Sequence, residues 1–238
     1  MKNPKVCIYT AIYGGYDDLK SQPEQSVDCD LICFSDRAIS ENNGWKIILN
    51  DDRKSMHPRM RAKFFKLMPH KLFRPSWLNI NSFFKDRLPF YDYTIWVDGS
   101  VQIRSSSFVE ELLQSIGYYG MAMFIHPDRN CIYEEVLYCR KMVKYQYLPL
   151  DNQVSYYRSK GYPEYNGLMA AGIIVRDMRR KKLKTIDNKW WQENLRWSYQ
   201  DQISLPFVLW KNRYGYDKIN LNLWNNHLFD LISHHSDE

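Results

Sequence analysis

The stretch YDYTIWVDGSVQI, residues 91–103, joins a buried strand to a polar turn. Residues 94–97 are β-branched, aromatic or aliphatic, a composition typical of a strand that is covered on both faces. Asp98 follows at the carboxyl end of this strand, and Gly99 permits a sharp turn. A carboxylate just beyond a buried strand is costly unless it caps the turn or binds a cation. Because an aspartate–glycine pair is also ordinary turn chemistry, the segment alone leaves both interpretations open.

Strand-like and helix-like segments alternate along the rest of the chain. We predict strands at residues 6–13, 30–35, 45–49, 94–97, 101–103, 121–126 and 172–176. We predict helices at residues 58–68, 107–115, 133–147, 189–197 and 202–210. This order predicts an α/β fold with a mixed, mostly parallel central sheet flanked by helices. No repeat or Gly/Ser-rich linker divides the sequence, so we expect one domain over residues 1–238 with a flexible tail from about residue 229.

Basic residues are concentrated in two parts of the chain. The net charge is +6, and residues 53–87 hold ten basic side chains and one acid, while residues 176–184 hold six more basic side chains. Such clusters favour a polyanionic partner: a phosphate-bearing ligand, a nucleic acid or an anionic membrane surface. The alternative for each cluster is a solvated helix face.

The cysteine and hydropathy patterns set the expected compartment. The five cysteines are odd in number and have no CxxC spacing, which favours neither a disulfide framework nor a zinc module. The longest apolar run, residues 167–175, is only about half a membrane span, and the N-terminal residues show no apolar signal core. We therefore expect a cytoplasmic protein without a transmembrane segment, and peripheral membrane contact stays open.

Polar residues follow three predicted strands. Tyr13 and Gly14 end the first strand, Asp36 ends the second, and Asp98 ends the fourth. The carboxyl ends of parallel strands share one edge of a sheet, which is where ligands bind in open α/β folds. A diphosphate bound there needs Lys, Arg or a divalent cation to neutralise its charge. The GxxxxGK[ST] and GxGxxG loops are missing, which argues against P-loop enzymes, kinases and dinucleotide oxidoreductases.

Seven blocks of sequence, taken in order, resemble one known family. They are VCIYTAIYGGYDDL, DLICFSDRAISENNGW, RMRAKFFKLMPHKL, LPFYDYTIWVDGSVQI, HPDRNCIYEEV, NGLMAAGIIVRDM and WWQENLRWSYQDQISLPFVLW. Together they look like the glycosyltransferase-like family typified by plant mucilage-related and turgor-regulation-defect proteins, over about residues 5–228. The resemblance implies a GT-A type fold with a Rossmann-type nucleotide-sugar-binding domain. It also implies a hexosyl- or uronosyltransferase that moves a sugar from a nucleoside-diphosphate sugar, most of all a UDP-sugar, to a glycan or polysaccharide acceptor.

The resemblance also implies a metal site. The segment IWVDGS stands where such enzymes carry an Asp-x-Asp signature, which gives Asp98 the role of binding Mn²⁺ or Mg²⁺. Ser100 replaces the second acid of the signature, so metal dependence stays open. GT-A enzymes often complete their metal site from a C-terminal segment, and we therefore prefer His227 over His126 as a further ligand.

The residues expected to bind the donor come from the predicted strand ends, the first helix and the loop before residue 172. They are Thr10, Tyr13, Gly14, Asp36, Arg59, Lys63, Asp98, Gly99, Ser100 and Gly167. Arg59 and Lys63 lie four residues apart on one helical face and can reach donor phosphates, although a solvated face explains them equally well. Asp36 either accepts hydrogen bonds from the nucleoside or makes an Asx turn.

The catalytic base depends on the stereochemistry of transfer. An inverting transfer needs a carboxylate that takes the acceptor's proton. Asp201 is our first candidate and Glu164 the second, although Asp201 can also simply cap a helix. A retaining transfer needs no conventional base, and the sequence does not decide between them.

Two other classes of function compete with the enzyme. The missing second acid favours a non-catalytic nucleotide- or glycan-binding module of the same fold. The basic segment 53–87, with interleaved aromatic residues, prompts a nucleic-acid-binding hypothesis. Its aromatic residues are Phe64, Phe65, Phe73, Trp77 and Phe83. No RNP, KH or helix-turn-helix signature accompanies them, so we expect no nucleic-acid partner.

Overall fold

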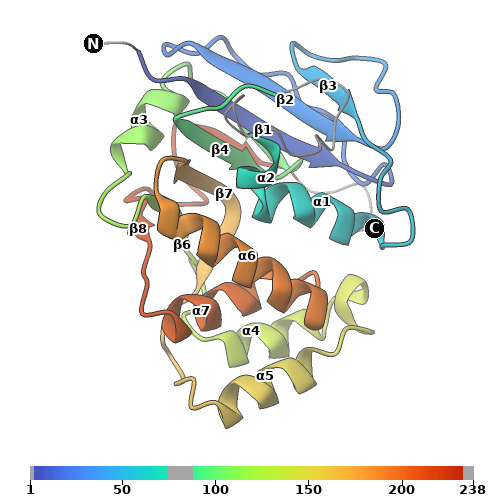
Figure 1. The fold of residues 1–238 in the computed structure, drawn as a ribbon, viewed down its shortest axis with the longest axis vertical. Helices are drawn as coiled ribbons and strands as arrows, with labels where there is room; N and C mark the ends of the chain where they lie inside the picture. Colours follow the sequence, from blue (N-terminus) through green and yellow to red (C-terminus); the bar gives the residue numbers. More distant parts are fainter. Residues whose placement is uncertain (1–2, 74–87, 233–238) are drawn as a thin grey trace.

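A seven-stranded sheet forms the centre of the protein in the computed structural model, which describes residues 3–73 and 88–232 (Figure 1). Its order is β3-β2-β1-β4-β7-β6-β8. The strands are β1 (Val6–Ile12), β2 (Cys29–Ser35), β3 (Lys46–Leu49), β4 (Tyr93–Val97), β6 (Met121–Ile125), β7 (Met169–Asp177) and β8 (Asp217–Lys218). Strand β7 runs antiparallel to both of its neighbours, and the other neighbouring pairs are parallel. The predicted mixed, mostly parallel sheet is confirmed.

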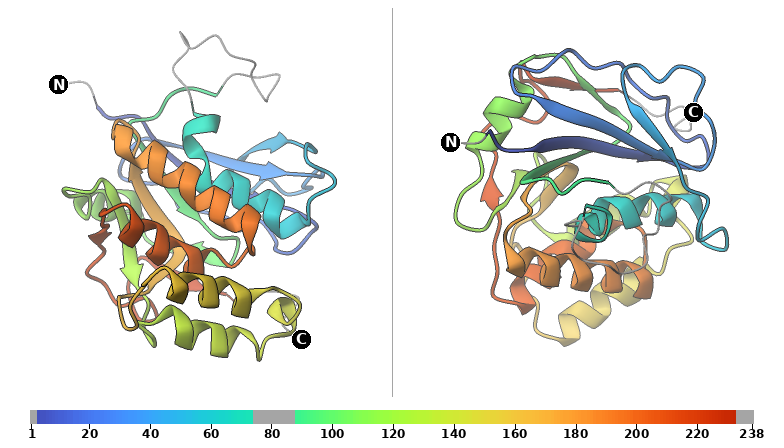
Figure 2. Two further views of the ribbon diagram at one scale, coloured as in Figure 1. Left: turned by 60° about the horizontal axis from the view of Figure 1, so that its bottom comes forward. Right: turned by 45° about the horizontal axis from the view of Figure 1, so that its top comes forward.

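Helices cover both faces of the sheet. They are α1 (Pro58–Leu67), α2 (Pro69–Leu72), α3 (Phe108–Gln114), α4 (Ile132–Cys139), α5 (Leu150–Ser159), α6 (Lys181–Arg196) and α7 (Asp201–Lys211), with the short 3₁₀ helix η1 (Val143–Tyr145). Helices α1, α2, α6 and α7 pack on one face, and α3 packs on the other beside the two-stranded ribbon of β5 (Val101–Ile103) and β9 (Phe229–Leu231). Helices α4 and α5 form an outer layer against α7 (Figure 2). Within the described ranges, no helix combines the length and apolarity needed to cross a membrane.

Strand β1 shows why the sheet is buried on both sides. Its successive side chains point to opposite faces of the sheet. Cys7, Tyr9 and Ala11 pack with α1 and α6, whereas Val6 and Ile8 pack with α3. A nearly continuous apolar run is the pattern expected of a central parallel strand.

Several predicted boundaries differ from the structure. Strand β7 begins at Met169 rather than at residue 172, and the short strand β8 was not predicted. The helix predicted over residues 133–147 is wrong, because α4 ends at Cys139 and α5 begins after Pro149 as an unpredicted helix. Helix α6 begins at Lys181 rather than 189: its first two turns are highly charged, but they bury Leu183 and Ile186 at helical spacing. The tail predicted from about residue 229 is also different, because residues 229–231 pair with β5.

The carboxyl ends of β1 and β2 meet at one edge of the sheet, as predicted. Ile12 pairs with Ser35 in the parallel register, so the residues after each strand lie side by side. The backbone N–H of Gly14 donates to the Asp36 carboxylate at 3.1 Å. We call this edge the rim. The residues that follow β4 reach the same edge, since β4 is also parallel to β1.

Candidate functional site

Asp98 lies at the rim with fixed hydrogen-bond donors. The indole Nε1 of Trp96, two residues earlier on β4, donates to Asp98 Oδ1 at 2.6 Å. The ammonium of Lys66 lies 3.0 Å from Oδ1 and 3.4 Å from Oδ2. The backbone N–H of Asp98 donates to Gly172 O of β7 at 2.8 Å, which fixes the turn after β4. The side chain of Asp98 is still 33% exposed, so part of the carboxylate faces solvent.

Lys66 connects Asp98 to a second carboxylate. Its Nζ atom lies 2.7 Å from Asp201 Oδ2, and its side chain is 1% exposed. Lys63, one turn earlier on α1, lies 2.9 Å from the same Asp201 oxygen. We call Lys63, Lys66, Asp98 and Asp201 the rim cluster: two ammonium groups and two carboxylates contributed by α1, the turn after β4, and α7. Charges buried to this extent require partners, and here each has one.

Burial and charge act in opposite directions on Asp201. Burial raises its pKa, but the ammonium groups of Lys63 and Lys66 outweigh burial and bring the pKa to about 2. Burial likewise lowers the pKa of Lys66, but Asp201 and Asp98 raise it above its ordinary value. The position of Asp201 in the first turn of α7 further favours its anionic form. A carboxylate that holds its negative charge so firmly accepts a proton poorly at neutral pH, which does not support the predicted role of Asp201 as general base.

The low pKa of Asp201 predicts an acid-sensitive fold. Its ordinary value is 3.8 and its folded value about 2, so its stabilising contribution is complete above pH 3.8 and is lost as the pH falls toward 2. This difference corresponds to about 2 kcal/mol of unfolding free energy. Urea unfolding at pH 5 and at pH 2.5 should show the loss in the wild type, and the loss should be smaller in Asp201→Asn. Equal losses in both proteins would contradict the assignment.

Aromatic side chains surround the exposed end of α1. The guanidinium of Arg59 lies 4.2 Å from the centre of the Tyr16 ring and 5.7 Å from the Tyr199 ring. His57 stacks on Tyr199 with ring centres 5.2 Å apart, and the Tyr199 hydroxyl donates to Lys144 O at 2.6 Å. Flat rings beside a cation suit stacking against a nucleobase or a sugar.

Gly99 is required by a close approach at the rim. A Cβ atom at this position would lie 2.5 Å from the Asp17 carboxylate, which comes from the loop after β1. Ser100 accepts a backbone hydrogen bond from Ile232 at 2.8 Å, just beyond β9. The turn after Asp98 is therefore held between the first loop and the last strand.

Several residues predicted to bind the donor lie inside the protein. Thr10 and Tyr13 are 2% and 3% exposed, and the Tyr13 hydroxyl donates to Asn50 O at 2.8 Å. Asp36 accepts from Gly14, as described above, and from Arg61 Nη1 at 3.3 Å. These side chains support the rim rather than line it. At the β6–β7 end of the sheet, the Gly167 N–H donates to Asn130 O at 2.9 Å, and no contact of Gly167 with the rim cluster is found among the described residues.

The three predicted metal ligands are not brought together. His227 Nε2 lies 2.9 Å from Glu111 on α3. The neighbouring Leu228 accepts from Arg104 at one end of the β5–β9 ribbon, whereas Ser100 lies at the other end. In the part of the chain that the structure describes, no three His, Cys, Asp or Glu side chains are placed to hold a metal ion. His227 and Ser100 therefore do not join Asp98 as ligands of the predicted Mn²⁺ or Mg²⁺ site.

The second histidine and the second base candidate also lie in other surroundings. His126 Nδ1 accepts the backbone N–H groups of Asp128 and Arg129, each at 3.2 Å, which makes it a loop-stabilising side chain. Glu164 accepts from Arg158 Nη1 at 2.7 Å beside the end of α5, with both side chains about half exposed. Glu164 is thus part of a surface ion pair.

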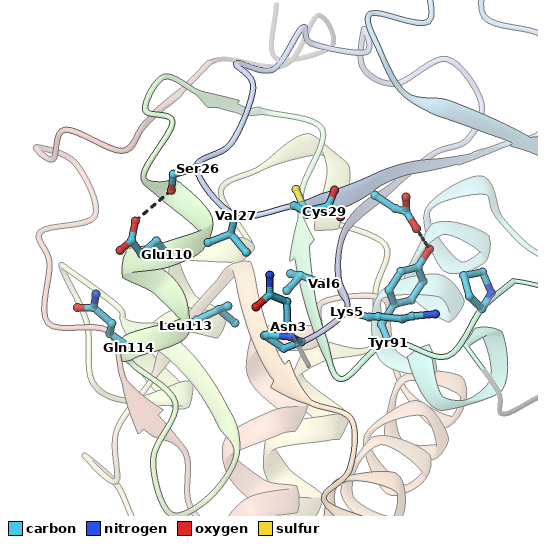
Figure 3. Close-up of a pocket in the computed structure, with 14 residues that line it drawn as sticks. Asn3, Lys5, Val6, Ser26, Val27, Cys29, Tyr91, Glu110, Leu113 and Gln114 are labelled. Carbon is cyan, nitrogen blue, oxygen red and sulfur yellow. Dashed lines mark hydrogen bonds between the residues drawn. The ribbon is translucent and has the colours of Figure 1, made fainter. Parts of the chain in front are cut away.

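A cavity of about 650 Å³ lies at the opposite edge of the sheet (Figure 3). It is lined by the amino ends of β1 and β2 and by α3. Three carboxylates, Asp28, Asp30 and Glu110, and one ammonium group, that of Lys5, are part of its lining. An excess of negative charge repels a diphosphate, so this cavity does not suit a nucleotide-sugar donor.

The aromatic residues that the structure describes in the basic segment do not support the nucleic-acid hypothesis. Phe64, Phe65 and Phe73 are at most 5% exposed and belong to the core, so they cannot stack on bases. Trp77 and Phe83, the other two aromatic residues of that hypothesis, lie outside the described residues.

Sequence reasoning missed Lys66, the Trp96 indole and Asp17. One signal was available for Lys66: it lies three residues after Lys63 and beside Phe64 and Phe65, so it belongs to the inward side of an amphipathic helix. A lysine in that position must meet a carboxylate inside the protein.

The mixed sheet and its covering helices are consistent with a Rossmann-like glycosyltransferase fold, and the comparison with protein families agrees. The chain belongs to the TOD1/MUCI70 glycosyltransferase-like domain family, whose model matches residues 1–236. A comparison with curated proteins gives no match.

Proposed function

We propose that the protein transfers a sugar from a nucleoside-diphosphate sugar, with a UDP-sugar as the first candidate, to a glycan or polysaccharide acceptor. The observation that supports this proposal is the rim cluster, which gathers four charged side chains where open α/β sheets bind ligands. Membership of a glycosyltransferase-like family gives the reaction class. The cytoplasmic location stays a prediction.

The residues around the rim divide into two roles in this proposal. Arg59 and the 19% exposed Lys63 supply positive charge to the donor diphosphate, and this charge stabilises the leaving group as its bond to the sugar breaks. The open part of the Asp98 carboxylate accepts a hydrogen bond from a donor hydroxyl. Tyr16 and Tyr199 provide flat surfaces for the base or the sugar.

Nucleotide binding gives the first test. Ligand at about 100 times its Kd should add roughly 2.7 kcal/mol to the unfolding free energy, which is a readable rise in Tm. We expect UDP to raise Tm more than GDP, CMP or ADP. Lys63→Met should reduce the rise, since it removes a cation at the diphosphate. The matched control is Lys71→Met, because Lys71 lies on the neighbouring α2. No shift with any of the four nucleotides would contradict the proposal.

One observation favours the binding module as the second candidate. Asp201, the first candidate for the base, is buried and already paired with two lysines. An inverting transfer would then need another proton acceptor, whereas a retaining transfer or a binding module would not. Incubation of the protein with UDP-sugars and a panel of glycans separates the two: release of UDP establishes transfer or hydrolysis, and saturable binding without release identifies a module.

A further inference from the structure

We propose that the ammonium of Lys66 occupies the place of a divalent cation at Asp98, so that the protein binds its nucleotide donor without a metal ion. The donor part of this inference rests on the proposed function. The part that concerns Asp98 and the metal does not, and it can be tested without any nucleotide.

The contacts of Asp98 carry the inference. Oδ1 already accepts from the Trp96 indole at 2.6 Å and from Lys66 at 3.0 Å, and Oδ2 lies 3.4 Å from the same ammonium. A carboxylate oxygen has two lone pairs, so Oδ1 is fully engaged by these two donors, while Oδ2 keeps one lone pair open beside the Lys66 ammonium. Both oxygens of this carboxylate thus lie within reach of one cation that belongs to the protein.

Lys66 is held where it is. Its side chain is 1% exposed, and Asp201 binds its Nζ atom at 2.7 Å from the side of α7. To leave Asp98, the ammonium would have to enter the apolar surroundings of α1 without a second carboxylate, which is costly. A divalent ion at Asp98 would therefore meet a fixed like charge at close range, and such repulsion is strong where water is excluded.

The charge that a metal would bring to the donor has another source. Lys63 is bound to Asp201, but its side chain is 19% exposed. Arg59 lies one turn before Lys63, near the amino end of α1. Fixed ammonium and guanidinium groups neutralise phosphate oxygens as a metal does. The rim cluster thus places one lysine beneath Asp98 and a second where it can meet the ligand.

A Mn²⁺ titration of the EDTA-treated full chain tests the inference. In the wild type we expect no saturable Mn²⁺ binding by electron paramagnetic resonance and no change of Tm with Mn²⁺. Lys66→Met removes the resident cation, so this variant should gain a Mn²⁺-dependent rise in Tm, and adding Asp98→Asn should abolish that rise. Lys63→Met is the matched control: it removes a lysine from the same helix but leaves the contact between Lys66 and Asp98, and it should gain no Mn²⁺ binding.

Two results would overturn the inference. One is a wild-type protein that binds one Mn²⁺ ion and loses it in Asp98→Asn, or in Asp17→Asn, which would show that the carboxylate packed against Gly99 completes a metal site. The other is UDP binding that requires Mn²⁺ in the wild type. If Lys66→Met does not fold, the comparison of wild type with Asp98→Asn still decides. Failure of every nucleotide to bind would reject the proposed function and leave the Mn²⁺ result standing.

Discussion

Replacing Asp98 with asparagine should reduce sugar transfer by about 10²–10³-fold, the range found when one preorganised polar group is removed from an active site. Asparagine has nearly the same shape, so its amide oxygen can still accept from the Trp96 indole. The change removes the negative charge that holds Lys66 beside the donor site, while Lys66 keeps Asp201 as a partner. Activity should therefore fall much further than stability.

The measurement is UDP release with saturating donor, together with the Tm of each protein. Asp230→Asn serves as the control, because Asp230 is also an acid on a strand but pairs with Arg104 at the surface, with a side chain 43% exposed. That variant should keep wild-type activity. An Asp98→Asn protein with full activity would remove Asp98 from the reaction.

Replacing Asp201 with asparagine should destabilise the protein by about 3–5 kcal/mol, the usual cost of leaving a buried charge without its partner. Asp201 is 2% exposed and serves both Lys63 and Lys66, at 2.9 and 2.7 Å. When the Asp201 charge is removed, Lys66 keeps only Asp98 as a carboxylate partner, and Lys63 loses the carboxylate that binds it. The loss should appear mainly as a lower urea midpoint with an unchanged m-value.

Urea unfolding at pH 7 measures this loss. Glu164→Gln provides the comparison, because it breaks an ion pair whose members are about half exposed and screened by water. Its effect should be much smaller. Similar midpoints for the two variants would show that the rim cluster contributes little to stability.

Most of the fold could be predicted because its strands and first helix carry strong local patterns. Strands β1, β2 and β4 and helix α1 lie within one residue of the predicted bounds, since each is a compact apolar or amphipathic run. Helix α5 was missed because it buries Gln153 as well as Leu150 and Tyr157, which hides the apolar period. The buried Gln153 is satisfied by Tyr157 and Ser198, and such tertiary hydrogen bonds leave no trace in local sequence.

The site could be predicted only in part. The sequence singled out Asp98, Lys63 and Asp201, and all three meet in the rim cluster. It assigned them to separate roles, because Lys63 and Asp201 are 138 residues apart and nothing local indicates their contact. The placement of His227 failed for the same reason: the register between β5 and β9, which takes His227 away from Ser100, is a property of the assembled fold.

The buried position of Lys66 has a consequence for how the chain can fold. Strands β1 to β4 and helix α1 are synthesised about a hundred residues before Asp201 in α7. Before α7 is synthesised, the Lys66 ammonium has only Asp98 as a carboxylate partner. Packing α1 onto the sheet at that stage would bury this ammonium without Asp201, which is costly. The first half of the chain is thus unsuited to persist as a separate compact unit. Helix α1, strand β4 and helix α7 should therefore become ordered together, so that the donor site forms only once the whole domain has folded.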